Sequence, residues 1–264
     1  MQVWIVNHFA LTPDQAGGTR HIQLAKEPRN HNIDTTIIGA GKQHISNRDQ
    51  VPEGKVWHRE MVEAVRFHWL QTPTAGAGNF HRVWNNISFA FSVMTRRGLN
   101  DLPKPDLILG TSPDLISALS AYVVARFFGV PFVLEIRDIW PLSAVEIGKV
   151  SKHHPFIITL SLLERFLYRN ADWIVTLLPG ASRHIVPRGG HQERITWIPN
   201  GVVIEDALTA PTKSAKDVGI FTLLYAGTHG NANGLDLTFA GSKCPQTTQP
   251  TQESKNSPDR RWTK

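Results

Sequence analysis

Short apolar runs rich in β-branched residues recur along the first 200 residues, and segments with helical spacing separate them. Such runs are typical of strands that are buried on both faces of a sheet. We expect strands at residues 3–6, 33–38, 56–60, 62–69, 106–109, 132–136, 172–177 and 195–198. Strands that alternate with helices predict an α/β fold, with a Rossmann-like parallel sheet and helices on both faces.

Helices are expected from about residue 18, over 80–94, from 113 to 128, over 155–169 and near 181–186. In the second of these, Val83, Trp84, Ile87, Phe91 and Met94 recur at helical spacing. The segment 155–169 has one apolar face, which favours a core helix over a membrane anchor. Ser112 is expected to cap the helix that begins at Pro113.

Trp173 and Trp197 fall within predicted strands, and both are expected in the core.

The stretch from Asn7 to His21 joins the first predicted strand to the first helix and holds the pair Gly17-Gly18. Glycine lets the backbone approach a phosphate, and the free N–H groups at a helix start favour an anion. The sequence therefore predicts a diphosphate site at Gly17, Gly18, Thr19, Arg20 and His21. A tight turn without a ligand remains an equal alternative, because the G-x-G-x-x-G pattern and the Walker lysine are both missing.

Other polar residues also follow strand ends. Ser112 comes after the strand at 106–109, and Asp138 follows the strand at 132–136. Ligands of open α/β sheets bind beyond the carboxyl ends of the strands. We therefore expect the glycine-containing stretch, Ser112 and Asp138 to face one cleft, with His8 nearby as a further contact.

A second domain is expected to begin late in the chain. Residues 1–202 form the first domain and 203–219 a linker, and a new strand at 220–225 runs into a glycine-rich loop within 220–236. This segment predicts the stub of a second Rossmann-like domain. Residues 237–264 lack periodicity and are expected to be disordered.

Composition narrows the choice of partners. The formal net charge is +6, but the last 28 residues carry five basic and two acidic residues and so hold half of that excess. The net charge is therefore weak evidence for nucleic-acid binding. The single cysteine, Cys244, excludes a disulfide framework, and the histidines at 153, 154, 184 and 191 do not share one helical face. We predict no metal site, and a cytoplasmic location because no signal segment opens the chain.

Four motifs together resemble a known family. They are GGTRH near the first helix, LEIRDIWP after a later strand, IPNGV at the domain exit, and LLYAGTHGNANGLD at the second-domain entry. The chain over residues 1–236 is similar to family 4 glycosyltransferases of bacterial surface-polysaccharide assembly, which have the two-domain GT-B architecture. The resemblance implies retaining transfer of a sugar from a nucleotide-sugar donor to a lipid-linked or polysaccharide acceptor, with no metal and no further cofactor.

The resemblance also implies roles for particular residues. Gly17 and Gly18 would approach the donor diphosphate. Arg137 stands where many relatives have a histidine, and it could clamp an anionic group but could not act as a general base. Asp138 would orient a sugar hydroxyl or the acceptor. Further substrate contacts are implied at Thr19, Arg20, His21, Ser112, Asn200, Gly227 and His229.

The sequence departs from the family after Asp236, where no donor-binding elements can be matched. We expect a truncated form, weakly active or inactive alone, with peripheral contact at the inner face of the cytoplasmic membrane. Three alternatives stay open: a second chain supplies the missing half, the protein is a non-catalytic binding remnant, or it is another nucleotide-binding Rossmann protein. The last is disfavoured because no acidic residue closes the second strand at Ile38.

Overall fold

The computed structural model describes residues 1–15, 17, 20–26, 31–42, 49–73, 79–148, 150–201, 225 and 235. The chain divides into two units, residues 1–212 and 213–264. In the second unit only Tyr225 and Leu235 are described. The expected linker, the start of a second domain and the tail therefore lie almost wholly outside the described residues.

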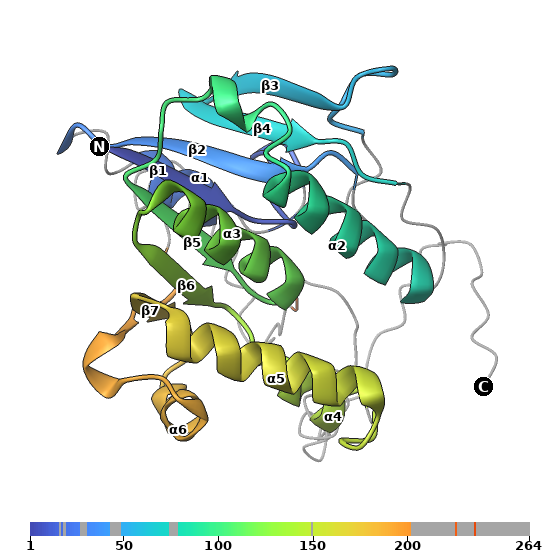
Figure 1. Cartoon of the computed structure of the whole chain (residues 1–264), viewed down its shortest axis with the longest axis vertical. Coiled ribbons are helices and arrows are strands. Elements are labelled where there is room, and N and C mark those ends of the chain that lie inside the picture. The colour runs from blue at the N-terminus through green and yellow to red at the C-terminus, as the bar shows by residue number, and fades with distance from the viewer. Residues whose placement is uncertain are drawn as a thin grey trace, which may run out of the picture. The chain divides into compact units, whose positions relative to one another are not determined.

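Eight strands form one sheet within the described part of the chain, in the order β3–β4–β2–β1–β5–β6–β7–β8 (Figure 1). All eight predicted strands are confirmed. Their bounds are β1 (Gln2–Val6), β2 (Asp34–Ala40), β3 (Trp57–Val62), β4 (Val65–Leu70), β5 (Leu107–Thr111), β6 (Phe132–Ile136), β7 (Trp173–Thr176) and β8 (Ile195–Trp197). Every pairing is parallel except that of β3 with β4.

The antiparallel edge departs from the all-parallel expectation. Only Glu63 and Ala64 connect β3 to β4, with φ angles of 47° and 66°. Two residues with positive φ make a tight hairpin, which joins antiparallel strands only. The hairpin thus ends the sheet on one side.

Helices cover both faces of the sheet. The α-helices are α1 (Arg20–Lys26), α2 (Asn79–Met94), α3 (Leu115–Phe128), α4 (Leu142–Glu146), α5 (Pro155–Asn170) and α6 (Ser182–Ile185), and short 3-10 turns are η2 (Leu99–Asp101), η3 (Val186–Arg188) and η4 (Gln192–Arg194). Helices α2, α3 and α5 lie side by side over one face, and α1 lies over the other (Figure 1). The prediction of a sheet covered on both faces is confirmed.

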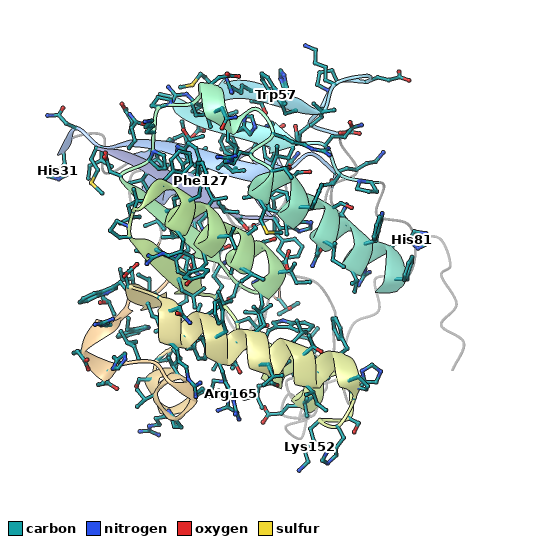
Figure 2. All side chains as sticks on the ribbon, in the orientation of Figure 1. His31, Trp57, His81, Phe127, Lys152 and Arg165 are labelled. Atoms are coloured by element: carbon teal, nitrogen blue, oxygen red, sulfur yellow. The ribbon has the colours of Figure 1, made fainter. Side chains whose placement is uncertain are left out.

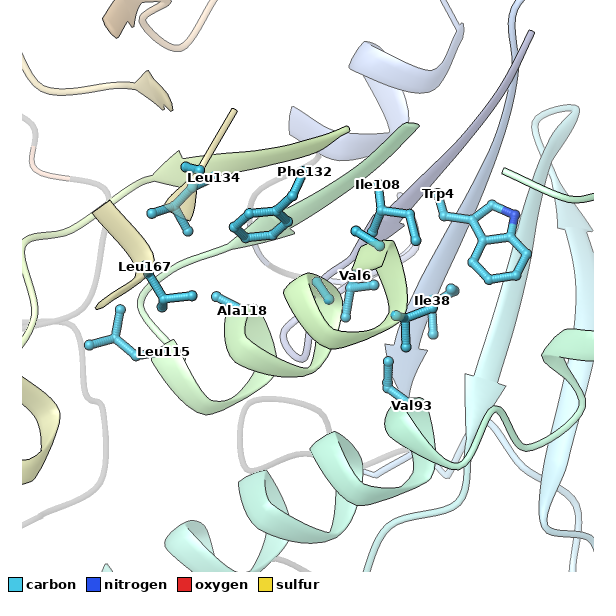
Figure 3. Packing of buried hydrophobic residues seen from close by; sticks show 14 of the residues in the cluster. Trp4, Val6, Ile38, Val93, Ile108, Leu115, Ala118, Phe132, Leu134 and Leu167 are labelled. Atoms are coloured by element: carbon cyan, nitrogen blue, oxygen red, sulfur yellow. The ribbon is translucent and has the colours of Figure 1, made fainter. Parts of the chain in front are cut away.

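Neighbouring residues of one strand belong to two separate hydrophobic cores, because successive side chains of a strand point to opposite faces of the sheet. Val6 and Ile38 pack with α2 and α3, and Figure 3 shows both beside Ala118 and Val93. Ile5 and Ile37 instead pack with Ile22 and Ala25 of α1. This double burial explains the almost continuous apolar character of the strands.

Two expectations about burial are wrong. Trp173 and Trp197 lie at the β7–β8 side of the sheet and are 43% and 56% exposed. Their indole nitrogens donate to Thr196 Oγ1 and to the Leu177 carbonyl, so the polar ends are held at the surface.

The cap of α3 also differs from expectation. Asp114, not Ser112, is the N-cap, and its carboxylate accepts from the Ile116 N–H at 3.1 Å. Gly129 closes the helix with a φ of 67°, a left-handed conformation that glycine adopts readily. The Ser112 side chain therefore does not cap α3, and its hydrogen bonds lie at the edge of the sheet.

Candidate functional site at the carboxyl edge of the sheet

The candidate site lies where several strands end. β1 lies between β2 and β5 in the sheet. The chain leaves β1 through α1 on one face and leaves β5 through α3 on the other, which makes the carboxyl ends of these two strands a topological switch point. Ligands of open α/β sheets bind at such a point.

Glu135 is the centre of this edge. Its side chain is fully buried in β6, and both oxygens are occupied. Oε1 lies 2.8 Å from Nε of Arg20, and Oε2 lies 2.6 Å from Nε2 of His21. A buried carboxylate needs such partners, because burying an unpaired charge is costly. The start of α1 is therefore tied to the end of β6.

The hydrogen bonds of His21 also involve Asn7. Asn7 Oδ1 accepts from the Phe9 N–H at 3.1 Å and from Thr111 Oγ1 at 3.2 Å, which turns the amide Nδ2 toward His21. Asn7 Nδ2 lies 2.9 Å from Nδ1 of His21, so Nδ1 must accept. Nε2 of His21 then donates to Glu135 Oε2. Asn7 and Glu135 together fix the orientation of the His21 ring.

The cluster controls the charge of Glu135. Burial alone would raise its pKa, but the hydrogen bond from His21 and the ion pair with Arg20 outweigh burial and lower the pKa to about 2. Glu135 is therefore a carboxylate at neutral pH and is unavailable as a proton donor. Its role in this geometry is to position Arg20 and His21.

Arg20 also holds the segment by which the chain leaves the sheet. Its two terminal nitrogens donate to the carbonyls of Ile198 at 3.1 Å and Pro199 at 2.9 Å, and one of them lies 3.5 Å from Asn200 Oδ1. We call residues 198–200 the exit segment. One guanidinium thus joins α1, β6 and the exit segment, a task that suits its fixed fork of donors.

Ser112 organises the turn after β6. It is fully buried, and its Oγ accepts from the N–H groups of Arg137 at 2.8 Å and Asp138 at 3.3 Å. Its own N–H donates to the Glu135 carbonyl at 2.8 Å. Asp138 Oδ1 in turn accepts from Ser143 Oγ at 2.6 Å, at the start of α4. Ser112 therefore sets the backbone that carries Arg137 and Asp138.

One buried polar atom of Arg137, its Nε, has no hydrogen-bond partner among the described residues. The pKa of Arg137 is lowered, mainly by burial and also by the nearby charge of Arg20, while Glu135 acts in the opposite direction. The arginine nevertheless stays charged. Two guanidinium groups thus face one carboxylate, and this imbalance favours an anionic ligand.

The other residues that the sequence predicted for the site separate into two groups. A Cβ on Gly17 would meet Cδ1 of Leu11, at the flexible end of that side chain, so Gly17 packs closely against Leu11. His8 is buried, and its Nε2 lies 2.6 Å from Asn85 Oδ1. The rest lie outside the described residues, namely Gly18, Thr19, Gly227 and His229.

The described part of the chain contains neither a cluster of metal ligands nor a helix that could span a membrane. It contains no group of three or more His, Cys, Asp or Glu side chains placed to hold a metal ion. None of its helices is both long enough and apolar enough to cross a membrane.

Glu135 and Asn7 are site residues that the sequence did not predict. A signal for Glu135 was present, since it is the one charged residue in the run Phe132–Ile136. A charge in a strand that is buried on both faces requires a partner, although the sequence does not say which. Asn7 gave no such signal, because polar residues are common just after a strand.

Known proteins share this architecture. Residues 17–201 match the family model described as "Glycosyl transferase 4-like domain". Sucrose-phosphate synthase from Thermosynechococcus elongatus is similar in structure, with a TM-score of 0.53 and 14% identity over 77% of this chain and 49% of that chain. An Anabaena protein, HepE, in complex with UDP and glucose matches with a TM-score of 0.43 and 13% identity over 78% of this chain and 46% of that one.

The likeness to sucrose-phosphate synthase concerns the fold alone, and the chain spans about half the length of that enzyme. No curated protein matches the chain. The family match, by contrast, covers more than half of the residues and includes Arg20, His21, Ser112, Glu135 and Arg137. The chain therefore belongs to the glycosyl transferase 4-like family.

Proposed function

We propose that this chain is the acceptor-side part of a retaining GT-B glycosyltransferase. It would take a sugar from a nucleotide-sugar donor and pass it to a lipid-linked or polysaccharide acceptor in cell-surface glycan synthesis, at the cytoplasmic face of the membrane. The observation that carries the proposal is the buried Nε of Arg137, which has no hydrogen-bond partner among the described residues at the carboxyl edge of the sheet. Such a group calls for an explanation, and a bound anion supplies one.

The proposed roles follow from the contacts at the edge. Arg137 would hold the donor diphosphate and stabilise the charge that develops on it as the sugar leaves. Asp138 keeps one oxygen on Ser143, and its second oxygen would orient a sugar hydroxyl. Arg20 and His21 position the start of α1, where backbone N–H groups would face the ligand. Gly17, Gly18 and Thr19 would form the near wall for the phosphates.

The other half of the site is part of the proposal as well. Asn200, which lies within reach of Arg20, would contact substrate at the exit segment. Gly227 and His229 would contribute from the second domain. A donor-binding half supplied by a second chain is the specific form we favour, and a binding module without catalysis is the alternative.

A transfer assay separates these two forms. The full chain would be incubated with a panel of radiolabelled nucleotide sugars and a lipid-linked acceptor, alone and with a separately expressed donor-binding domain of a GT-B enzyme. We expect transfer only when both proteins are present. Acceptor binding without transfer in either arm would favour the binding module and contradict the proposed reaction.

A further inference from the structure

Helix α2 carries its largest apolar side chains on the outside. Phe80 is 77% exposed, Trp84 52%, Ile87 40% and Phe91 54%. These residues are spaced four, three and four apart, so they fall within about 60° of the helix circumference. The side that faces the sheet is formed instead by Asn85, Phe89 and neighbouring residues. The apolar periodicity of α2 therefore describes an exposed stripe.

The neighbouring helices repeat this feature. On α3, Val123 and Phe127 are 39% and 61% exposed, and on α5, Ile158, Leu162 and Phe166 are 46%, 61% and 40% exposed. The three helices form one layer on the same face of the sheet, and Figure 2 shows Phe127 on α3 and Arg165 on α5. Scattered apolar residues are normal on protein surfaces, but stripes on three adjacent helices indicate an interaction surface.

Aromatic contacts connect the stripes. The Tyr122 ring of α3 meets Phe166 of α5 edge to face, with ring centroids 5.2 Å apart. The Arg96 guanidinium, just after α2, lies 3.7 Å from the ring centroid of Phe127. We call the exposed apolar residues of α2, α3 and α5, with the arginines of these helices, the helical face.

The helical face has charge of one sign. Within the bounds of α2, α3 and α5 the sequence holds one acidic residue, Glu164. Glu164 is 1% exposed and is engaged by His184 at 2.7 Å and by Tyr168 at 3.0 Å. All four arginines of these helices are exposed, and only one of them has an acidic partner among the described residues, Arg126 with Asp172 at 2.6 Å. The others are Arg82, Arg165 and Arg169.

We propose that the helical face rests on a lipid bilayer that contains anionic lipids. Aromatic and aliphatic side chains would enter the boundary between headgroups and acyl chains, and the arginines would meet the lipid phosphates. Arg165 and Arg169 suit this role, because they lie on the same side of α5 as Ile158 and Leu162. A second copy of this chain fits less well, since it would bring unpaired guanidinium groups of both copies together.

Contact between the helical face and the bilayer would bring the protein close to a lipid-linked acceptor. This part of the inference rests on the proposed function. A protein held on the bilayer meets such an acceptor in the plane where its sugar is exposed. The binding itself needs neither donor nor acceptor. Failure of sugar transfer and failure of membrane binding are therefore separate results.

Vesicle co-sedimentation of the full chain tests the proposal. We expect binding to vesicles of phosphatidylcholine with phosphatidylglycerol, weaker binding as salt is raised, and little binding to phosphatidylcholine alone. The double variant Trp84→Glu/Phe91→Glu should bind the anionic vesicles at least about tenfold more weakly. Met61→Glu is the matched control, because Met61 is 58% exposed and lies beside Ala25 of α1, away from the helical face.

A second double variant keeps the test decisive if the first one fails to fold. Arg165→Glu/Arg169→Glu changes only exposed side chains and should also lose anionic-vesicle binding by about tenfold, with an unchanged circular dichroism spectrum. Wild-type protein that stays in the supernatant with anionic vesicles would overturn the proposal. So would equal binding by the α2 variant. A dimer in solution that Trp84→Glu/Phe91→Glu dissociates would assign the helical face to a second copy instead.

Discussion

His21 Nε2 donates to Oε2 of Glu135 over 2.6 Å, although the two residues are 114 positions apart in the sequence. Together with Arg20 on the other oxygen, this bond fastens the start of the first helix to the end of β6. The edge that would receive an anion is thus built on a buried carboxylate, and its geometry depends on that carboxylate staying charged.

Replacing Glu135 should be costly. In Glu135→Gln the buried Arg20 loses its counter-charge, and breaking a buried ion pair from one side costs about 3 kcal/mol. We expect urea unfolding at pH 7 to show a loss of that size. Glu193→Gln is the matched control, because Glu193 is exposed and lies 3.6 Å from His191. Equal losses in the two variants would contradict the role given to Glu135.

Acid should destabilise the fold by protonating Glu135. Its pKa is lowered from 4.5 to about 2 in the folded chain, so it stabilises the fold above pH 4.5 and loses this contribution as the pH falls toward 2. The contribution is roughly 3 kcal/mol. Unfolding free energies measured between pH 5 and pH 2 should therefore decline more steeply in the wild type than in Glu135→Gln.

Arg20 should not tolerate replacement by lysine. A lysine keeps the charge but cannot reach Glu135 and the carbonyls of Ile198 and Pro199 together. We expect stability to decrease in the order wild type, Arg20→Lys, Arg20→Ala. Hydrogen exchange of the Ile198 amide, which donates to the Thr176 carbonyl at 2.9 Å, should accelerate in both variants, and Arg165→Ala should leave it unchanged. A protected Ile198 amide in Arg20→Ala would show that Arg20 does not hold this segment.

Ser112→Ala should disturb the turn that carries Arg137. The change removes the acceptor for the N–H groups of Arg137 and Asp138, and each buried donor left without a partner costs about 1–3 kcal/mol. Thermal unfolding should show a clear loss. Ser161→Ala on α5 changes a serine whose side chain makes no hydrogen bond with the described residues, and its melting temperature should match the wild type.

A second acid-sensitive point lies at the β3–β4 edge. His68 is buried, its Nδ1 accepts from Arg59 Nε at 3.2 Å, and its Nε2 donates to the Arg97 carbonyl at 3.0 Å. Burial lowers the pKa of His68 from 6.5 to about 4, despite the raising effect of the Arg97 carbonyl. Because the folded pKa is depressed, stability should fall by roughly 3 kcal/mol as the pH drops from 6.5 to 4.

His68→Gln tests this slope. The variant should be less stable at pH 7 but should lose less of its remaining stability between pH 6.5 and 4. His31→Gln changes an exposed histidine and should keep the wild-type slope. A full wild-type slope in His68→Gln would assign the acid sensitivity to another group, and buried His8, whose pKa burial also lowers, would be the first candidate.

The sheet could be predicted from sequence because burial on both faces requires apolar, β-branched strands such as Asp34–Ala40. The direction of α2 could not be predicted in this way. Helical spacing of Trp84, Ile87 and Phe91 identifies a stripe, but it does not say whether that stripe faces the sheet or the surroundings.

The candidate site divides along a similar line. Residues that follow strands, such as Ser112 and Asp138, could be placed at one edge because parallel strands end together. The Arg20–Glu135 pair could not, since it depends on side chains that meet across 115 positions. The cap of α3 is ambiguous in the sequence, because Ser112 and Asp114 can both cap a helix. In the structure the Asp114 carboxylate accepts from the Ile116 N–H.

Calorimetric titration of the full chain with UDP, as a nucleoside diphosphate probe, tests most directly whether this edge of the sheet binds an anion. We expect the wild type to bind, and Arg137→Ala, with unchanged stability, to bind at least about tenfold more weakly. Arg183→Ala, an arginine of α6, should bind like the wild type. Equal affinity in the wild type and Arg137→Ala, or no binding by the wild type, would contradict an anion site at Arg137.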